Sequence, residues 1–193
     1  ASGVGSDPNT KFALANNPDG ELPIFEFPLD YDQRHTGVVN VDYRFGSEDV
    51  PKGFLGSVLS NMALNTLFSF NSGRPYTVRD LPITAFGDDG EALSTKNEVY
   101  SGWNLRLDMK LDKTVNIWET SWNFYIYALN VLNSELVNGV YGATGRPDNN
   151  GYLQTPTGNA QNQNYKNNFE DRIKAIGNWG TPRQIRLGLK VSF

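Results

Sequence analysis

The segment from Trp103 to Asp112 constrains the fold of this chain more than any other part of the sequence. Every second residue along it is apolar, and the residues between them are Asn104, Arg106, Asp108, Lys110 and Asp112. Because successive side chains of a β-strand point to opposite faces, this alternation predicts a strand with one apolar and one charged face. The charges alternate in sign, so they can pair within the strand and with its neighbours.

Four more segments show the same period of two, which predicts five strands near residues 34–45, 57–71, 103–112, 121–130 and 181–193. Strands of globular proteins average about 5–6 residues, and these are longer. About ten residues is the length that a tilted strand needs to cross a lipid bilayer. Aromatic side chains gather near the strand ends, as in the aromatic belts of outer-membrane proteins, at Tyr43, Phe45, Phe68, Phe70, Trp103, Trp122 and Phe193.

A soluble β-sandwich would also hide one face of each strand, against a second sheet. The connections favour the membrane protein instead. Residues 46–56 and 113–120 are short links, whereas 72–102 and 131–180 are long and rich in turn-forming residues. Short turns at one end and long loops at the other are typical of outer-membrane barrels, and long unstructured loops are uncommon in compact soluble domains. One short helix is expected at 166–176, with Phe169, Ile173 and Ile176 on one face.

The composition excludes several classes of protein. The chain has no cysteine, so disulfides, thiolate metal sites and a cysteine nucleophile are ruled out. His35 is the single histidine, and we expect it to be structural or interfacial. The net charge is −4, so the composition gives no sign of the basic surface that a nucleic-acid-binding protein requires. No apolar run is long enough for a membrane-spanning helix, and residues 1–6 do not resemble a signal peptide.

Two turn sequences, Gly87–Gly90 and Asp148–Gly151, are rich enough in Asp and Asn to suggest calcium. The full calcium-loop pattern is absent, and turn chemistry explains both sequences without an ion. No Ser-His-Asp set, phosphate loop or paired-carboxylate motif stands out. We therefore expect no enzyme activity, no catalytic residues, no metal site and no cofactor.

Five short stretches carry a resemblance to a known family: Asp30–Thr36, Ser72–Thr77, Asn130–Asn133, Val140–Gly145 and Pro182–Phe193. Their order and spacing resemble the C-terminal part of TonB-dependent outer-membrane receptors, of the Oar-like kind with a carboxypeptidase-regulatory-like domain. The resemblance covers about residues 24–193. It implies an all-β fold in which residues 1–193 supply the C-terminal strands of an antiparallel transmembrane β-barrel of about 22 strands. The plug domain of such receptors is not present in this chain, and an open sheet edge in lipid requires further strands.

The same resemblance implies ligand-gated import of a bulky nutrient across the outer membrane of a Gram-negative bacterium, with the long loops extracellular. The implied partners are outer-membrane lipid, the remainder of the barrel and plug, the TonB complex, the barrel-assembly machinery and a surface lipoprotein. The alternative is a surface β-rich adhesin or binding module without transport, whose apolar face would pack against another apolar face of the chain. The transported ligand and its binding residues are not predicted.

The alternation also predicts which way the side chains face. Leu105, Leu107, Met109, Leu187, Leu189 and Val191 are expected to face lipid. The expected interior face consists of Asn40, Asp42, Arg44, Asn61, Asn65, Asn104, Arg106, Asp108, Lys110, Arg186 and Lys190. The resemblance further implies that the last strand is an assembly signal, read by strand addition through Phe193, Val191, Leu189 and Leu187. The alternative for Phe193 is an aromatic-belt residue at the membrane interface.

Overall fold

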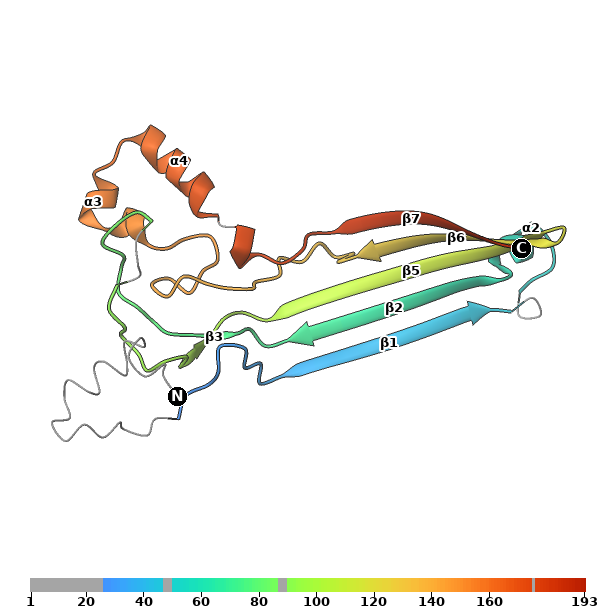
Figure 1. Cartoon of the computed structure of the whole chain (residues 1–193), viewed down its shortest axis with the longest axis horizontal. Helices are drawn as coiled ribbons and strands as arrows, with labels where there is room; N and C mark the ends of the chain where they lie inside the picture. Colours follow the sequence, from blue (N-terminus) through green and yellow to red (C-terminus); the bar gives the residue numbers. More distant parts are fainter. Residues whose placement is uncertain (1–25, 47–49, 87–89, 175) are drawn as a thin grey trace. The chain divides into compact units, whose positions relative to one another are not determined.

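The computed structural model describes residues 26–46, 50–86, 90–174 and 176–193 (Figure 1). These residues form two compact units. The sheet unit consists of residues 34–72, 103–137 and 179–193, and the loop unit consists of the described residues of 26–33, 73–102 and 138–178. In the described part of the chain, no helix combines the length and the apolarity that crossing a lipid bilayer would require.

The sheet unit is built from long antiparallel strands, so the chain is mostly β-structure as the alternation predicts. The strands are β1 (Thr36–Phe45), β2 (Met62–Asn71), β5 (Asn104–Ile117), β6 (Thr120–Leu129) and β7 (Gln184–Ser192). Their order in the sheet is β1-β2-β5-β6-β7, so strands adjacent along the sheet are also consecutive long strands of the chain (Figure 1). Within the described residues, β1 and β7 each pair along one side, and the sheet is open.

This meander gives the sheet two different ends. The links from β2 to β5 and from β6 to β7 are long and leave the same end of the sheet, which we call the loop end. The links from β1 to β2 and from β5 to β6 are shorter and lie at the opposite end, which we call the turn end. The alternation of short and long connections therefore corresponds to two opposite ends of one sheet.

The largest differences from the predicted strand boundaries are at the start of β2 and the end of β5. β2 begins at Met62 rather than near residue 57, because Phe54–Leu59 form a short helix, α2. Asn61, expected on the interior face, lies outside the strand, where its backbone has a φ of 54°. β5 continues to Ile117, so the expected link at 113–120 shrinks to residues 118 and 119.

The loop unit contains short elements around a small apolar core. Its strands β3 (Pro75–Tyr76) and β4 (Val99–Tyr100) pair in antiparallel fashion. Its helical elements are η1 (Tyr152–Gln154), α3 (Pro156–Asn159), α4 (Gln163–Ile173) and η2 (Ile176–Asn178). The helix expected at 166–176 is α4, which begins three residues earlier because the Asn162 side chain caps it by accepting from the Tyr165 amide.

Candidate functional site

The apolar face of the sheet forms continuous rows of side chains across the strands. One row contains Val41, Thr66, Met109, Ala128 and Ile185, and the next contains Tyr43, Leu64, Leu111, Ile126 and Leu187. All six residues expected to face lipid lie on this face, because they share the parity of these rows.

This apolar face is exposed. Leu187 is 77% exposed, Val41 is 55% exposed and Ile126 is 44% exposed. Among the described residues, the buried hydrophobic side chains are Tyr152, Phe169 and Ile173, and all three belong to the loop unit. Exposed apolar patches of this kind mark surfaces that contact lipid or another protein.

Aromatic side chains lie at both ends of this apolar face. At the loop end, the Trp103 ring stacks on His35 with 5.8 Å between ring centroids and lies 6.4 Å from Phe70. At the turn end, Tyr43 and Phe45 meet edge to face at 4.7 Å. His35 therefore contacts a tryptophan ring at this end, and its expected structural or interfacial role stays a prediction. The aliphatic rows of this face therefore lie between two groups of aromatic side chains.

Ion pairs cover the opposite face of the sheet. They join Asp42 to Arg44 at 3.0 Å, Arg106 to Asp108 at 2.8 Å and Lys110 to Asp112 at 3.6 Å. Each pair lies within one strand, two residues apart, as the alternating signs of the sequence predict. The Asp42–Arg44 and Lys110–Asp112 pairs are at least partly exposed, and exposed pairs contribute little to stability, so the main effect of these two is to balance charge on this face.

Neutral contacts complete the polar face. Asn65 donates to Asn40 across β1 and β2 at 2.9 Å, and Asn123 donates to Thr114 across β5 and β6 at 2.9 Å. Tyr125 also lies on this face, under the Lys110 ammonium, which is 5.8 Å from the ring centroid. The face is therefore amphipathic rather than purely charged, and it offers hydrogen-bonding groups to a polar neighbour.

Three residues at the loop end, Asn104, Asp108 and Asn130, form a buried set that we call the polar cluster. Asp108 accepts hydrogen bonds from Arg106 at 2.8 Å and from the Asn130 amide at 2.8 Å. Asn104 donates to the Val137 carbonyl at 3.0 Å and accepts from the Val137 amide at 2.7 Å. Asn104 and Asp108 lie at polar-face positions of β5, the face expected to be the interior, and they also bond Val137 and Asn130 of the long connection after β6.

Asn130 and Asn133 explain one of the sequence motifs. Both have left-handed backbones, with φ values of 50° and 51°, a conformation that asparagine tolerates better than most residues. The Asn130 side chain bonds Ser134 and the Thr181 carbonyl, and Asn133 accepts from the Arg183 amide at 3.1 Å. The motif therefore closes the base of the long connection between β6 and β7.

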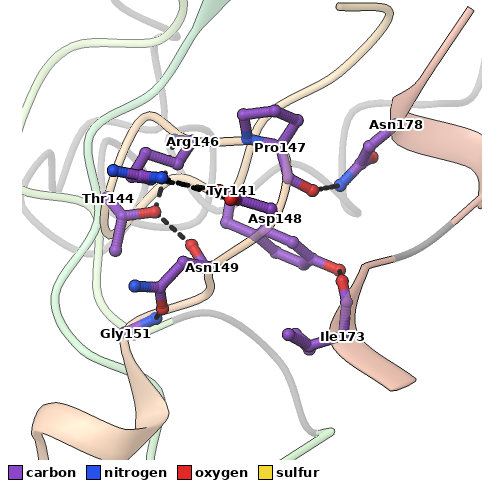
Figure 2. A network of polar contacts seen from close by, with 9 residues as sticks. All are labelled: Tyr141, Thr144, Arg146, Pro147, Asp148, Asn149, Gly151, Ile173 and Asn178. Carbon is purple, nitrogen blue, oxygen red and sulfur yellow. Dashed lines mark hydrogen bonds and ion pairs between the residues drawn. The ribbon is translucent and has the colours of Figure 1, made fainter. Parts of the chain in front are cut away.

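The loop unit has its own polar network, shown in Figure 2. The Tyr141 hydroxyl donates to the Ile173 carbonyl at 2.9 Å, and Asn178 donates to the Pro147 carbonyl at 3.0 Å. Arg146 holds Asp148 through two parallel bonds of 3.0 and 3.1 Å. The hydrogen bond from this guanidinium lowers the pKa of the Asp148 carboxyl below its ordinary value.

This network accounts for the Asp148–Gly151 turn. Asp148 bonds Arg146, Asn149 accepts from the Gly151 amide at 2.8 Å, and Asn150 accepts from the Tyr152 amide at 3.0 Å. The side chains that suggested a calcium site therefore make hydrogen bonds within the turn itself. No group of three His, Asp or Glu side chains lies close enough to hold a metal ion in the part of the chain described. In the other turn sequence, Gly87–Gly90, the first three residues lie outside the described residues.

A second network of the loop unit uses the aspartates of the segment that precedes β1. The Asn97 side chain donates to Asp30 at 2.6 Å and to the Pro28 carbonyl at 2.7 Å. The Tyr100 hydroxyl donates to Asp32 at 2.6 Å. Both aspartates belong to the Asp30–Thr36 motif, so that motif fastens the segment to the β3–β4 ribbon. Sequence reasoning did not find this pairing, because its partners lie more than sixty positions apart.

The expected assembly residues lie on and just beyond the edge strand β7. Leu187, Leu189 and Val191 share the apolar face, and Phe193 follows the last strand residue with its side chain fully exposed. One long side of β7 is unpaired in the described chain, so it is open to strand addition.

Comparisons of this chain with protein-family models, with curated proteins and with solved structures found no match.

Proposed function

We propose that this chain supplies wall strands and outer loops of a transmembrane β-barrel in the outer membrane of a Gram-negative bacterium. The observation that carries the proposal is the exposed apolar face, with aliphatic rows lying between two aromatic ends. Its opposite face carries ion pairs and amides, which suit a hydrated barrel interior. A sheet that separates these two environments needs lipid on one side and water or a polar plug on the other.

The strand lengths agree with this proposal. β1 has 10 residues, which at about 3.3 Å per residue gives about 33 Å. At a tilt of about 40°, this length spans about 25 Å along the membrane normal, the height of the apolar band of such barrels. The edges β1 and β7 would pair with strands outside this chain, because an unpaired edge in lipid leaves backbone groups unsatisfied.

We further propose that the complete barrel is a TonB-dependent receptor that imports a bulky nutrient. The support is the resemblance carried by five motifs. Three of them make the hydrogen bonds described above: Asp30–Thr36, Asn130–Asn133 and Val140–Gly145. The protein then performs no chemistry on its ligand. Transport consists of binding at the outer loops and release toward the periplasm, driven through a plug and the TonB complex.

Membrane location and orientation are tested together with single cysteines, since the chain has none of its own. Leu93→Cys lies in the loop unit, and Glu119→Cys lies in the β5–β6 turn; both positions are exposed. In intact cells, a membrane-impermeant maleimide should label Leu93→Cys and leave Glu119→Cys unlabelled until the outer membrane is permeabilised. Labelling of Glu119→Cys alone in intact cells would reverse the orientation. Full extraction of the protein without detergent would refute the membrane location.

Import is tested by comparing solute consumption in three strains: wild type, one lacking this protein and one lacking TonB. We expect at least one bulky solute that both mutant strains fail to consume.

A binding module without transport is the second candidate, and the separate core of the loop unit favours it. In that case, attachment to a surface or glycan would be lost in the strain lacking this protein and retained in the strain lacking TonB.

A further inference from the structure

The short helix α2 at the turn end of the sheet has its apolar side chains on the outside. Phe54 is 82% exposed, Leu55 is 66% exposed and Val58 is 44% exposed. The buried residue of the helix is Gly56. Surface helices of water-soluble proteins have the opposite arrangement, with the apolar stripe toward the core. The reversed polarity of α2 therefore indicates an apolar environment outside the protein at this position.

Specific contacts hold α2 in this orientation. A Cβ atom at Gly56 would lie 1.8 Å from the Pro51 carbonyl oxygen, so a glycine is required where the helix meets the preceding chain. The Lys113 ammonium donates to the carbonyl of Ser57 at 2.8 Å and to that of Ser60. A cation at the C-terminal carbonyls of a helix is favourable. The outward apolar stripe is thus part of the folded unit.

Lys113 also shows where α2 lies. It occupies an apolar-face position of β5, opposite Met62 on β2 and Phe124 on β6. The Lys113 side chain extends from this face to the last carbonyls of α2. The C-terminal end of the helix therefore lies at the margin of the apolar face. The apolar stripe of α2 and the aromatic pair of Tyr43 and Phe45 therefore both lie at the turn end of the sheet.

We propose that α2 lies in the membrane interface at the turn end, with Phe54, Leu55 and Val58 inserted among the lipids. This inference rests on the proposed function, and it adds a lipid-binding element outside the strands. The helix has six residues, so its length of about 9 Å is too short to cross the membrane. A helix this short is marginal in water on its own. Burial of its apolar stripe at the boundary between headgroups and acyl chains would stabilise it.

The test uses single-cysteine variants of the protein, reconstituted in vesicles of phosphatidylethanolamine and phosphatidylglycerol. Phe54→Cys places an environment-sensitive fluorophore on the apolar stripe, and Ser57→Cys places it at the polar side chain of the same helix, about 100° around the axis from the centre of the stripe. Both positions are exposed, so neither change removes a buried side chain. Quenching by a lipid with a nitroxide near the headgroup should be about threefold stronger at Phe54→Cys, and quenching by aqueous iodide should be stronger at Ser57→Cys.

A third variant, Leu187→Cys, separates this inference from the proposed function, because Leu187 lies on the apolar face of β7. A nitroxide deep in the bilayer should quench its label if the sheet spans lipid. If lipid quenches Leu187→Cys while iodide quenches both α2 labels equally, α2 lies in water and the inference is wrong. If neither quencher reaches Phe54→Cys, a protein covers the helix, which also overturns it. Failure at Leu187→Cys overturns the proposed function itself.

Discussion

Asn130 shows at the scale of a single residue how the base of a long loop is fixed. It is 1% exposed, and its side chain makes hydrogen bonds of 3.0 Å to Ser134 and 3.2 Å to the Thr181 carbonyl. Asn130→Ala should destabilise the folded protein by about 2–4 kcal/mol, because it removes the hydrogen bonds of a buried side chain and puts alanine in a left-handed backbone. Asn130→Gly is the matched control, since it loses the same bonds and relieves the backbone strain.

Thermal unfolding of the purified protein in detergent measures both Asn130 variants. The glycine variant should recover about 1 kcal/mol of the loss. Equal stability of the alanine variant and the parent would mean that the side-chain bonds of Asn130 contribute nothing to the folded state.

A pH dependence of the loop unit is expected from Asp148. Its ordinary pKa is 3.8, and the hydrogen bond from Arg146 lowers it in the folded protein. A carboxyl with a depressed folded-state pKa contributes stability above its unfolded pKa and loses it as the pH falls through the folded pKa. The protection factors of the amides in residues 138–178, which correct for the pH dependence of intrinsic exchange, should therefore fall as the pH drops below about 4.

The control for this pH dependence is Asp148→Asn, which keeps the shape of the side chain and removes its charge. This variant should exchange faster than the parent at neutral pH and should respond less to acid. The contribution is small because both side chains are partly exposed to solvent. A parent and variant with the same acid response would assign the effect to other carboxyls.

The strands were predictable from sequence because a period of two is a local pattern. The alternation located all five long strands and the apolar and charged faces of β5. The predicted strand ended at Asp112 although β5 continues, because Lys113 puts a charge in an apolar-face position. Nothing local indicates that the ammonium of Lys113 caps α2. The alternation also missed α2, since six residues are too few to show a helical period. Contacts such as Tyr141 to Ile173 join positions 32 apart, and no local pattern encodes them.

The two faces of strand β2 give a matched pair of substitutions at the scale of an element. Leu64 lies on the apolar face, opposite Tyr43 and Leu111, and Asn65 follows it on the polar face, opposite Asp42 and Lys110. Leu64→Arg should cost about 2–4 kcal/mol if this face contacts lipid near the middle of the bilayer. Asn65→Arg should cost about 1 kcal/mol or less, mainly for its bond to Asn40.

Unfolding of both β2 variants by urea in lipid vesicles gives these free energies. The comparison needs no assumption about the rest of the barrel, because both residues are half-buried neighbours on one strand. Equal costs at the two positions would contradict a sheet with lipid on one side and water on the other.

At the scale of the whole molecule, the five long strands form an open sheet that does not close on itself within the described residues. Its apolar face is exposed, and β1 and β7 are open edges within the described residues. The proposed function accounts for both features, because further strands would close the sheet in a membrane. The number of strands in the proposed barrel comes from the resemblance, because the alternation describes only the strands of this chain. The ligand cannot be predicted from the sequence either. The conformation of the loop unit depends on contacts between residues distant along the chain, which no local pattern encodes.

The final prediction concerns assembly of the proposed barrel and depends on Phe193. This residue follows β7 and is fully exposed, so its deletion removes no packed contact of the sheet and should leave thermal stability nearly unchanged. Trp118 is the matched control, because it is an equally exposed aromatic in the turn between β5 and β6. If both residues serve only as interfacial aromatics, Phe193→Ser and Trp118→Ser should lower outer-membrane levels to a similar, small extent. If the assembly machinery reads the last strand by adding it to an exposed edge, Phe193→Ser alone should deplete the outer membrane and accumulate periplasmic intermediates. Quantitative immunoblots of outer-membrane and periplasmic fractions distinguish the two, and equal levels of both variants would reduce Phe193 to a residue of the aromatic belt.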